Sequence, residues 1–217
     1  MKSILVEENM RLELKVKKRI ESYSPKGGLD QTSLIFLQIS KINHAHVKSH
    51  MERVALLADE TAKKLKKDNK AAFFGGLLHD VGKIILPYQL FDGHNIDSAE
   101  YAEVKTHALA GFEALKDLHL FVAFCAGAHH ALYKNGYGLA VEDFPSEWGI
   151  ETVKKVLDIS TIISICDFVD AFTHRKTKIK DGSNKKAKNL RGMLIKKYPN
   201  DINIVDMVLT VNKDLKM

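Results

Sequence analysis

The sequence predicts an all-α fold. Apolar residues recur with helical spacing along most of the chain, and the alternation typical of half-buried strands is nearly absent. Hydrophobic residues make up 45% of the 217 positions and charged residues 28%, as in ordinary soluble globular proteins. No run approaches the roughly 18 apolar residues that a membrane-spanning helix needs, so we expect a cytoplasmic protein without a membrane partner.

The first part of the chain, residues 1–44, is expected to be a helical N-terminal prefix. Apolar residues recur with charges between them from Ile4 to Ile20, the segment 24–28 (SPKGG) interrupts this pattern, and a second apolar stretch begins near Leu34. Amphipathic helices of this kind bury one face but do not indicate against what. A homodimer formed through such helices is therefore one arrangement that the sequence allows.

The remaining residues, 45–217, are expected to form one domain. A long helix is predicted from about Ala45 to Lys67, followed by a tightly packed helix of small apolar residues from Ala71 to Leu78, after which Gly82 permits a turn. Further helices are predicted at about 98–116, 120–131, 151–173 and 187–197, with a last short one from about Ile204, and an exposed, mobile loop is predicted at 181–186.

Charge and cysteine content exclude some functions. The net charge of +6 suits an anionic partner without specifying one. Most of the basic residues are lysines in scattered pairs such as Lys63-Lys64, which we interpret as a solvated surface rather than a nucleic-acid interface. Cys125 and Cys166 lie in apolar runs without the spacing of a metal or redox pair, so a disulfide scaffold is excluded.

The segment 77–83 (LLHDVGK) carries the strongest chemical signal. It places the imidazole of His79, the carboxylate of Asp80 and the ammonium group of Lys83 at the end of an apolar helix. An unpaired carboxylate is costly to bury, whereas a metal ion would satisfy both the histidine and the aspartate. The alternative is structural, with Asp80 capping the next turn and His79 hydrogen-bonded in the core.

Two further histidines lie one helical turn apart on the long helix after residue 45. His46 and His50 share a face at this spacing and could meet a metal ion together, although a surface pair is the alternative. Arg53 follows His50 and could orient a carboxylate of the site or hold the helix in place.

Metal-binding side chains recur in the second half of the chain. His107 lies among small residues, where a lone histidine is more often structural. The pair His129-His130 ends an apolar run, which is harder to explain as packing. Asp167 lies inside a hydrophobic helix, where a carboxylate needs a partner, and a metal ion is one good answer.

The order of these residues resembles the HD-domain metal-dependent phosphohydrolase superfamily, and within it most closely the HD-GYP cyclic di-GMP phosphodiesterases. The resemblance covers roughly residues 45–210 and rests on five segments in the same order: HMERVALLA from His50, GLLHDVGKI from Gly76, VKTHALAG from Val104, the histidine pair at 129–130, and ICDFVDAFTHR from Ile165.

The resemblance implies an HD-domain helical bundle with a buried dinuclear metal site. Asp80 would bridge two divalent ions. We expect these to be iron or manganese, with zinc as the alternative. The resemblance assigns one ion to His50, His79, Asp80 and Asp167, and the other to Asp80, His107, His129 and His130. His46 stands where some HD-GYP proteins have a glutamate that binds a third metal, so it is a further candidate ligand.

The resemblance also implies a substrate, a cyclic dinucleotide such as cyclic di-GMP, hydrolysed through a metal-bridging hydroxide. Asp80 and Lys83 would act in catalysis, and Lys83, Tyr137 and Arg175 would contact the substrate. The loop after His130 departs from the family, because the usual glutamate is Ala131 and the proline of the GYP motif is replaced by glycine. Metal binding therefore carries over more directly than the exact substrate.

The sequence leaves three functions open. The first is a phosphodiesterase acting on a cyclic dinucleotide, and the second keeps the metal centre but hydrolyses another nucleotide. The third is a degenerate module that binds a nucleotide without turning it over. Every expected ligand position is filled, which favours an enzyme, whereas a plain helical interaction protein would leave the buried polar side chains without a reason.

Overall fold

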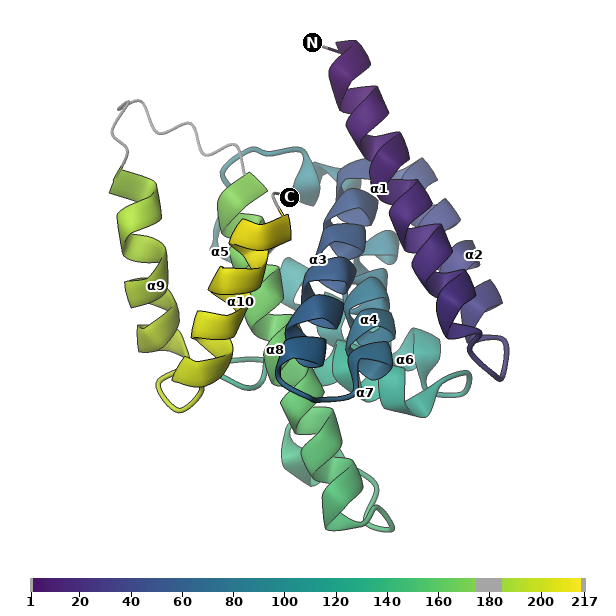
Figure 1. Ribbon diagram of the computed structural model, residues 1–217, viewed down its shortest axis with the longest axis vertical. Helices are drawn as coiled ribbons and strands as arrows, with labels where there is room; N and C mark the ends of the chain where they lie inside the picture. The colour runs from purple at the N-terminus through teal and green to yellow at the C-terminus, as the bar shows by residue number, and fades with distance from the viewer. Residues whose placement is uncertain (1, 175–184, 216–217) are drawn as a thin grey trace.

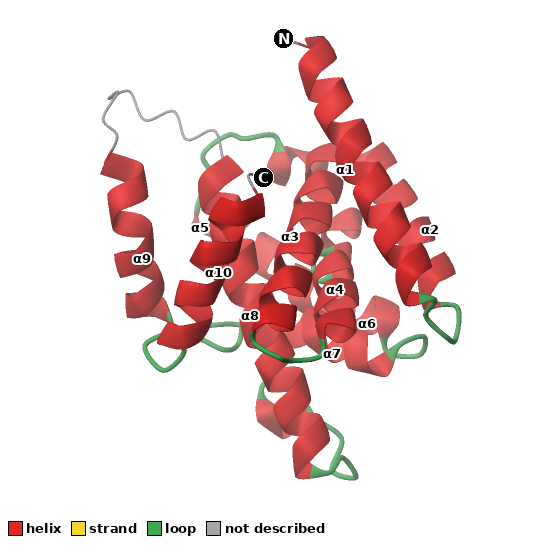
Figure 2. Cartoon of the chain, viewed as in Figure 1, coloured by secondary structure: helices red, strands yellow, loops and turns green. Residues whose placement is uncertain are grey.

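The computed structural model describes residues 2–174 and 185–215, and over these residues it is entirely helical, without strands (Figure 2). The fold class predicted from the sequence is confirmed. The α-helices are α1 (Lys2–Tyr23), α2 (Leu29–Asn43), α3 (Ala45–Lys64), α4 (Asn69–Leu78), α5 (Ser98–Lys105), α6 (His107–Leu115), α7 (Leu120–Ala128), α8 (Ile150–His174), α9 (Lys185–Lys197) and α10 (Ile202–Leu215), and the short 3-10 helices are η1 (Val81–Ile85), η2 (Tyr88–Phe91) and η3 (Val141–Asp143). None of the helices described is both long and apolar enough to cross a membrane.

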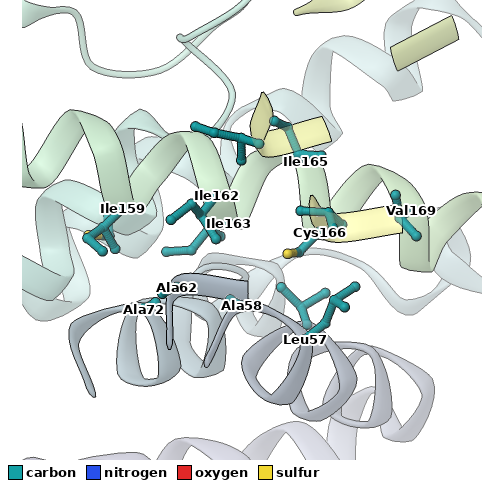
Figure 3. Packing of buried hydrophobic residues seen from close by; sticks show 14 of the residues in the cluster. Leu57, Ala58, Ala62, Ala72, Ile159, Ile162, Ile163, Ile165, Cys166 and Val169 are labelled. Carbon is teal, nitrogen blue, oxygen red and sulfur yellow. The ribbon is translucent and has the colours of Figure 1, made fainter. Parts of the chain in front are cut away.

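The centre of the molecule is the packing of α3 and α4 against α8. Leu57, Ala58 and Ala62 of α3 and Ala72 of α4 face an isoleucine-rich side of α8, and the buried residues Ile159, Ile162, Ile163, Cys166 and Val169 lie on that helix (Figure 3). Small residues also let α3 and α4 approach each other closely, since a Cβ atom added to Gly76 of α4 would lie 3.0 Å from the Cα of Ala55 on α3. The helices that carry the candidate site are therefore fixed by a continuous apolar core.

The N-terminal prefix packs on the opposite side of α3 and α4 from α9 and α10 (Figure 1). Val16 and Ile20 of α1 and Leu37 of α2 are buried in a second apolar cluster with Met51 and Phe74. Ion pairs add to this contact, because Arg19 pairs with the fully buried carboxylate of Asp59 on α3. In the fold, α1 and α2 thus share a core with the helix that carries His50.

Several boundaries differ from those predicted, and the helix predicted at 120–131, for example, ends at Ala128. The helix predicted at 98–116 is two helices, because the carbonyls that end α5 are taken by local donors: the Thr106 hydroxyl bonds the Glu103 carbonyl at 2.7 Å, and His107 Nδ1 bonds the Val104 carbonyl at 2.6 Å. The long helix after residue 45 ends at Lys64 and not at Lys67, because Lys66 adopts a positive φ of 55°. The loop predicted at 181–186 lies outside the described residues up to 184, and its last two residues, Lys185 and Lys186, are not a loop but the start of α9.

Candidate metal centre

Asp80 lies at the centre of the candidate site, directly after the end of α4. Its side chain is fully buried, and the backbone around it is tightly enclosed. A Cβ atom added to Gly82 would lie 2.0 Å from the carbonyl oxygen of His107 and 2.6 Å from the amide nitrogen of Gly111. Only glycine therefore lets η1 approach α6 so closely, and this contact brings His107 to Asp80.

Three buried histidines surround Asp80 in the same way. In each of them Nδ1 bonds the backbone carbonyl of the third residue before it, at 2.7 Å in His79, 2.6 Å in His107 and 2.7 Å in His129. A carbonyl oxygen only accepts, so Nδ1 carries the proton and the lone pair of each imidazole is on Nε2. All three histidines owe this geometry to their position at a helix end: His79 and His129 follow α4 and α7, and His107 begins α6.

The Nε2 atoms of these histidines converge on the Asp80 carboxylate. Their distances to its nearer oxygen are 3.3 Å for His79, 3.2 Å for His107 and 3.9 Å for His129. The three Nε2 atoms and Asp80 Oδ1 are all buried without a hydrogen-bond partner. Four acceptors cannot satisfy one another, whereas a cation between them would satisfy all four, so the donor set fits a bound metal ion.

A second set of side chains completes the site from α3, from α8 and from the turn after α7. Nε2 of His50 lies 3.0 Å from Asp167 and 3.4 Å from Asp80, and Nε2 of His130 lies 3.9 Å from Asp167. The side chains of His50, His130 and Asp167 are 14%, 12% and 14% exposed, whereas Asp80 is fully buried. The site therefore opens to solvent on this side.

These residues form two groups that could each hold a metal ion. His50, His79 and Asp80 make one, and His107, His129 and His130 make the other, with one ligand atom from each residue lying within 4.8 Å of the others in its group. Imidazole and carboxylate ligands of this kind suit iron, manganese or zinc better than calcium or magnesium.

The carboxylates of the centre are held ionised. Burial by itself would raise the pKa of Asp80, but the positive charge around this carboxyl, including that of Lys83, holds its pKa well below the ordinary value. Asp167 follows the same pattern, because the effect of His50 outweighs the effect of burial and keeps the pKa of this carboxyl well below its usual range. The site thus presents ionised carboxylates to a cation.

The pKa values of the imidazoles shift in different directions. Burial lowers the pKa of His130 to about 3, and burial also lowers the pKa of His129 well below its ordinary value, so both are neutral and ready to bind a metal. Burial would also lower the pKa of His50, but Asp167 and Asp170 outweigh it and raise this pKa well above the ordinary value. A bound cation would replace the proton on His50 Nε2, while Nδ1 would keep its hydrogen bond to Asp170.

Two residues of the site were not predicted as such from the sequence. Asp170 accepts a hydrogen bond from His50 Nδ1 at 2.7 Å and two from Arg53, at 2.7 and 2.9 Å, so the carboxylate that Arg53 orients is Asp170. Tyr133 lies with its hydroxyl 3.3 Å from Nδ1 of His130. Asp170 could have been found from the sequence, because it lies three residues after Asp167 and therefore on the same helix face. Tyr133 could not, because it lies in a loop without periodicity.

The seven ligand residues that the resemblance assigns all lie together in the structure, namely His50, His79, Asp80, His107, His129, His130 and Asp167. His46 is exposed and belongs to neither three-residue group. Lys83 donates a hydrogen bond to Asp80, and the Tyr137 ring lies 4.6 Å from the ring of His130. Arg175 lies outside the described residues.

The loop after His130 folds back over the centre. The amide of Tyr137 donates to the carbonyl of His130 at 2.9 Å, and the amide of Leu139 donates to the carbonyl of Gly127 at 2.8 Å. Gly138 makes this return possible, because its φ is +107° and a Cβ atom there would lie 2.1 Å from the Gly127 carbonyl oxygen. The loop that departs from the HD-GYP sequence still holds a tyrosine against the site.

Comparison with known families decides the classification. The model of the HD domain family matches residues 47–206, which include every candidate ligand except His46. The chain belongs to the HD-domain family. As an HD-domain protein it is a metal-dependent phosphohydrolase, and the histidines and aspartates around Asp80 are its candidate metal ligands.

Solved structures support the fold of this HD domain. The chain is similar to the HD domain of the phosphodiesterase PgpH from L. monocytogenes, with 19% identity over 84% of this chain and 99% of that chain and a TM-score of 0.59. The same domain in complex with cyclic-di-AMP matches with 21% identity over 83% and 96% of the two chains and a TM-score of 0.58. No curated protein sequence matches the chain.

Proposed function

We propose that this HD domain is a phosphodiesterase that hydrolyses a cyclic dinucleotide. The observation that carries the proposal is the set of four unpartnered buried acceptors at Asp80, continued by three partly exposed ligands that open it to a substrate. A similar HD domain binds cyclic-di-AMP, which supports this substrate class. The resemblance to HD-GYP proteins favours cyclic di-GMP, so both dinucleotides are candidates.

Two divalent ions bound here would activate a water molecule and neutralise charge on the attacked phosphate. Asp80 contacts ligands from both three-residue groups, lying 3.4 Å from His50 and 3.2 Å from His107, and we assign it the bridging position. Iron or manganese is the preferred pair, with zinc as the alternative, and a third ion would need the exposed His46 as a ligand.

Lys83 is the residue of this chain best placed to act on the phosphate. Its ammonium group donates to Asp80, and its side chain is 14% exposed, so it reaches both the centre and the solvent-facing side. A fixed cation there can stabilise negative charge that develops on the phosphate oxygens. Tyr137 covers His130 on the other side, and we assign its ring to the wall of the substrate site.

The proposal is tested by metal analysis and turnover on one preparation. The full chain is purified without chelator, reconstituted without oxygen with iron or manganese, and analysed for metal content. The same sample is incubated with cyclic di-AMP, cyclic di-GMP and a panel of linear nucleotides, and the products are separated by chromatography. We expect two metal ions per chain and a linear dinucleotide or mononucleotide product from at least one cyclic dinucleotide.

The controls separate the alternatives. The variant Lys83→Ala should keep its metal content and lose turnover on the order of a hundredfold, because a positioned charge donor contributes about 10²–10³ to the rate. Turnover of linear nucleotides alone would replace the proposed substrate class with another. Metal binding with affinity for a dinucleotide but no turnover would make the domain a nucleotide sensor, and absence of metal after reconstitution would overturn the site.

A further inference from the structure

An aromatic wall adjoins the metal centre on the side of Lys83. It consists of His44 and His46, at the start of α3, and of Tyr88 and Phe91, in η2. Ring centroids within this group lie 5.4 Å apart for His44 and Phe91, 6.3 Å for His46 and Tyr88, and 6.4 Å for His46 and Phe91. Two segments that are distant in the sequence thus gather four rings at one place.

Contacts on its buried side hold the wall in position. His44 is 2% exposed, and its Nε2 lies 3.2 Å from the carbonyl oxygen of Leu86, which joins the start of α3 to the turn before η2. The ring of His44 is parallel to the ring of Tyr88, with 1° between their planes and 6.0 Å between their centroids. Leu90 is buried and anchors η2 to the core. Tyr88 therefore has a fixed support.

The front of the wall faces solvent. Tyr88 is 55% exposed, although it has a large apolar ring, and His46 is also exposed. The His46 ring is nearly perpendicular to that of Tyr88, at 77°, so the two rings form a corner. An exposed, supported aromatic corner offers a flat apolar face to a flat ligand, and a nucleobase is such a ligand.

The wall is continuous with the centre through Lys83. The ammonium group of this residue donates to Asp80 and lies 5.9 Å from the centroid of the Phe91 ring. His46 lies one helical turn before the candidate ligand His50 on α3. A substrate whose phosphate lies at Lys83 and the metal ligands can therefore extend its attached nucleoside along this wall.

From this arrangement we infer that Tyr88, His46 and Phe91 form the subsite for one nucleobase of the substrate. The inference rests on the proposed function, since it takes the phosphate of a nucleotide to lie at the metal centre. Stacking on this wall recognises a base by its flat face, and it makes the domain prefer nucleotide esters over simple phosphate esters. Tyr88 and His46 are then specificity residues, which touch the base and not the reacting atoms.

The test compares variants of the full chain in steady-state turnover of cyclic di-AMP and cyclic di-GMP. Tyr88→Ala and His46→Ala should each raise KM about tenfold, with a smaller change in kcat, because stacking on one ring is lost. Tyr88→Phe keeps the ring and should restore most of the affinity. Ile150→Ala removes an 82% exposed side chain at the start of α8, about 25 Å along that helix from Asp167, and is the matched surface control.

A second measurement does not depend on turnover. A cyclic dinucleotide that carries 2-aminopurine is titrated into the wild-type chain and the variants, since stacking quenches the fluorescence of this base. Quenching by the wild type and by Tyr88→Phe, and weaker quenching by Tyr88→Ala, is the expected result. Circular dichroism melts verify that each variant is folded.

The outcomes for the subsite and for the proposed function are distinguishable. If the wild type turns over a cyclic dinucleotide and Tyr88→Ala and His46→Ala leave KM and quenching unchanged, the subsite is wrong and the proposed function stands. If the wild type neither hydrolyses nor quenches a cyclic dinucleotide, the proposed function fails. Quenching that depends on Tyr88 without turnover supports the subsite in a binding protein.

Discussion

The candidate centre has two halves that differ in how their side chains are held. We call His79, Asp80, His107 and His129 the buried half and His50, His130 and Asp167 the open half. The buried half is at most 1% exposed, and each of its histidines is oriented by a backbone carbonyl. In the open half, His50 is oriented by Asp170 and His130 by Tyr133.

This difference shows which parts of the site can change without loss of the fold. A carbonyl acceptor is fixed by the helix that carries it, so the buried half depends on helix packing and its small residues. The side-chain partners of the open half can be replaced one at a time, because neither of them is part of a helix backbone. We therefore expect the buried half to determine whether metal binds, and the open half to determine how tightly it binds.

The largest effect is expected from Asp80→Asn, which removes the carboxylate that contacts both halves. Loss of metal-based charge stabilisation, worth several kcal/mol, corresponds to a fall in turnover on the order of a thousandfold. Elemental analysis should show fewer than two ions per chain. The exposed Asp117→Asn is the control and should match the wild type. Full metal content in Asp80→Asn would contradict the bridging position.

Gly82→Ala should break the buried half without altering a ligand. The added methyl group would meet the His107 carbonyl, so η1 and α6 must move apart, and such overpacking costs about 1–3 kcal/mol. We expect a lower melting temperature in calorimetry and reduced metal content. Gly149→Ala is the matched control, because a Cβ atom there has no neighbour within 4 Å. If Gly82→Ala is destabilised but keeps its full metal content, then the buried half tolerates the separation of η1 from α6 as well as the open half does.

Asp170→Asn should weaken the open half while the fold remains. An outer partner of a metal-binding histidine is worth about 10–100-fold in metal affinity or activity, so we expect a loss in that range. Metal titration followed by turnover at saturating metal measures the two contributions separately. Asp158→Asn on the same helix removes only a surface ion pair with Lys67 and should have little effect. If Asp170→Asn lost as much metal affinity and turnover as Asp80→Asn, the open half would be as sensitive as the buried half.

The smallest effect is expected from Tyr133→Phe, which removes the hydroxyl next to Nδ1 of His130. One hydrogen bond contributes about 0.5–1.5 kcal/mol, which corresponds to a two- to tenfold change in metal affinity. The ring remains, so its contact with Lys197, whose ammonium lies 3.6 Å from the ring centroid, is kept. A metal titration against the wild type measures the change. A complete loss of metal would show that the open half is as sensitive as the buried half.

Much of the architecture could be predicted from the sequence. Helical periodicity is a local property, so the all-α class and most of the helices follow from the spacing of apolar residues. The ligand types were equally visible, because imidazole and carboxylate groups interrupt apolar runs at His79-Asp80, His129-His130 and Asp167. The break at Thr106 was missed, since it depends on side chains that capture the carbonyls at the end of α5.

What only the tertiary structure decided is which side chains support the ligands. Asp170 meets His50 across 120 positions of the chain, and no local pattern encodes a contact between helices so far apart in sequence. The division into a buried and an open half also depends on packing, because Gly82 brings His107 to Asp80 while α8 leaves Asp167 at the solvent-facing side. The sequence determined which residues are candidate metal ligands, and helix packing determined how each of them is held, because orientation depends on neighbours that only the fold brings together.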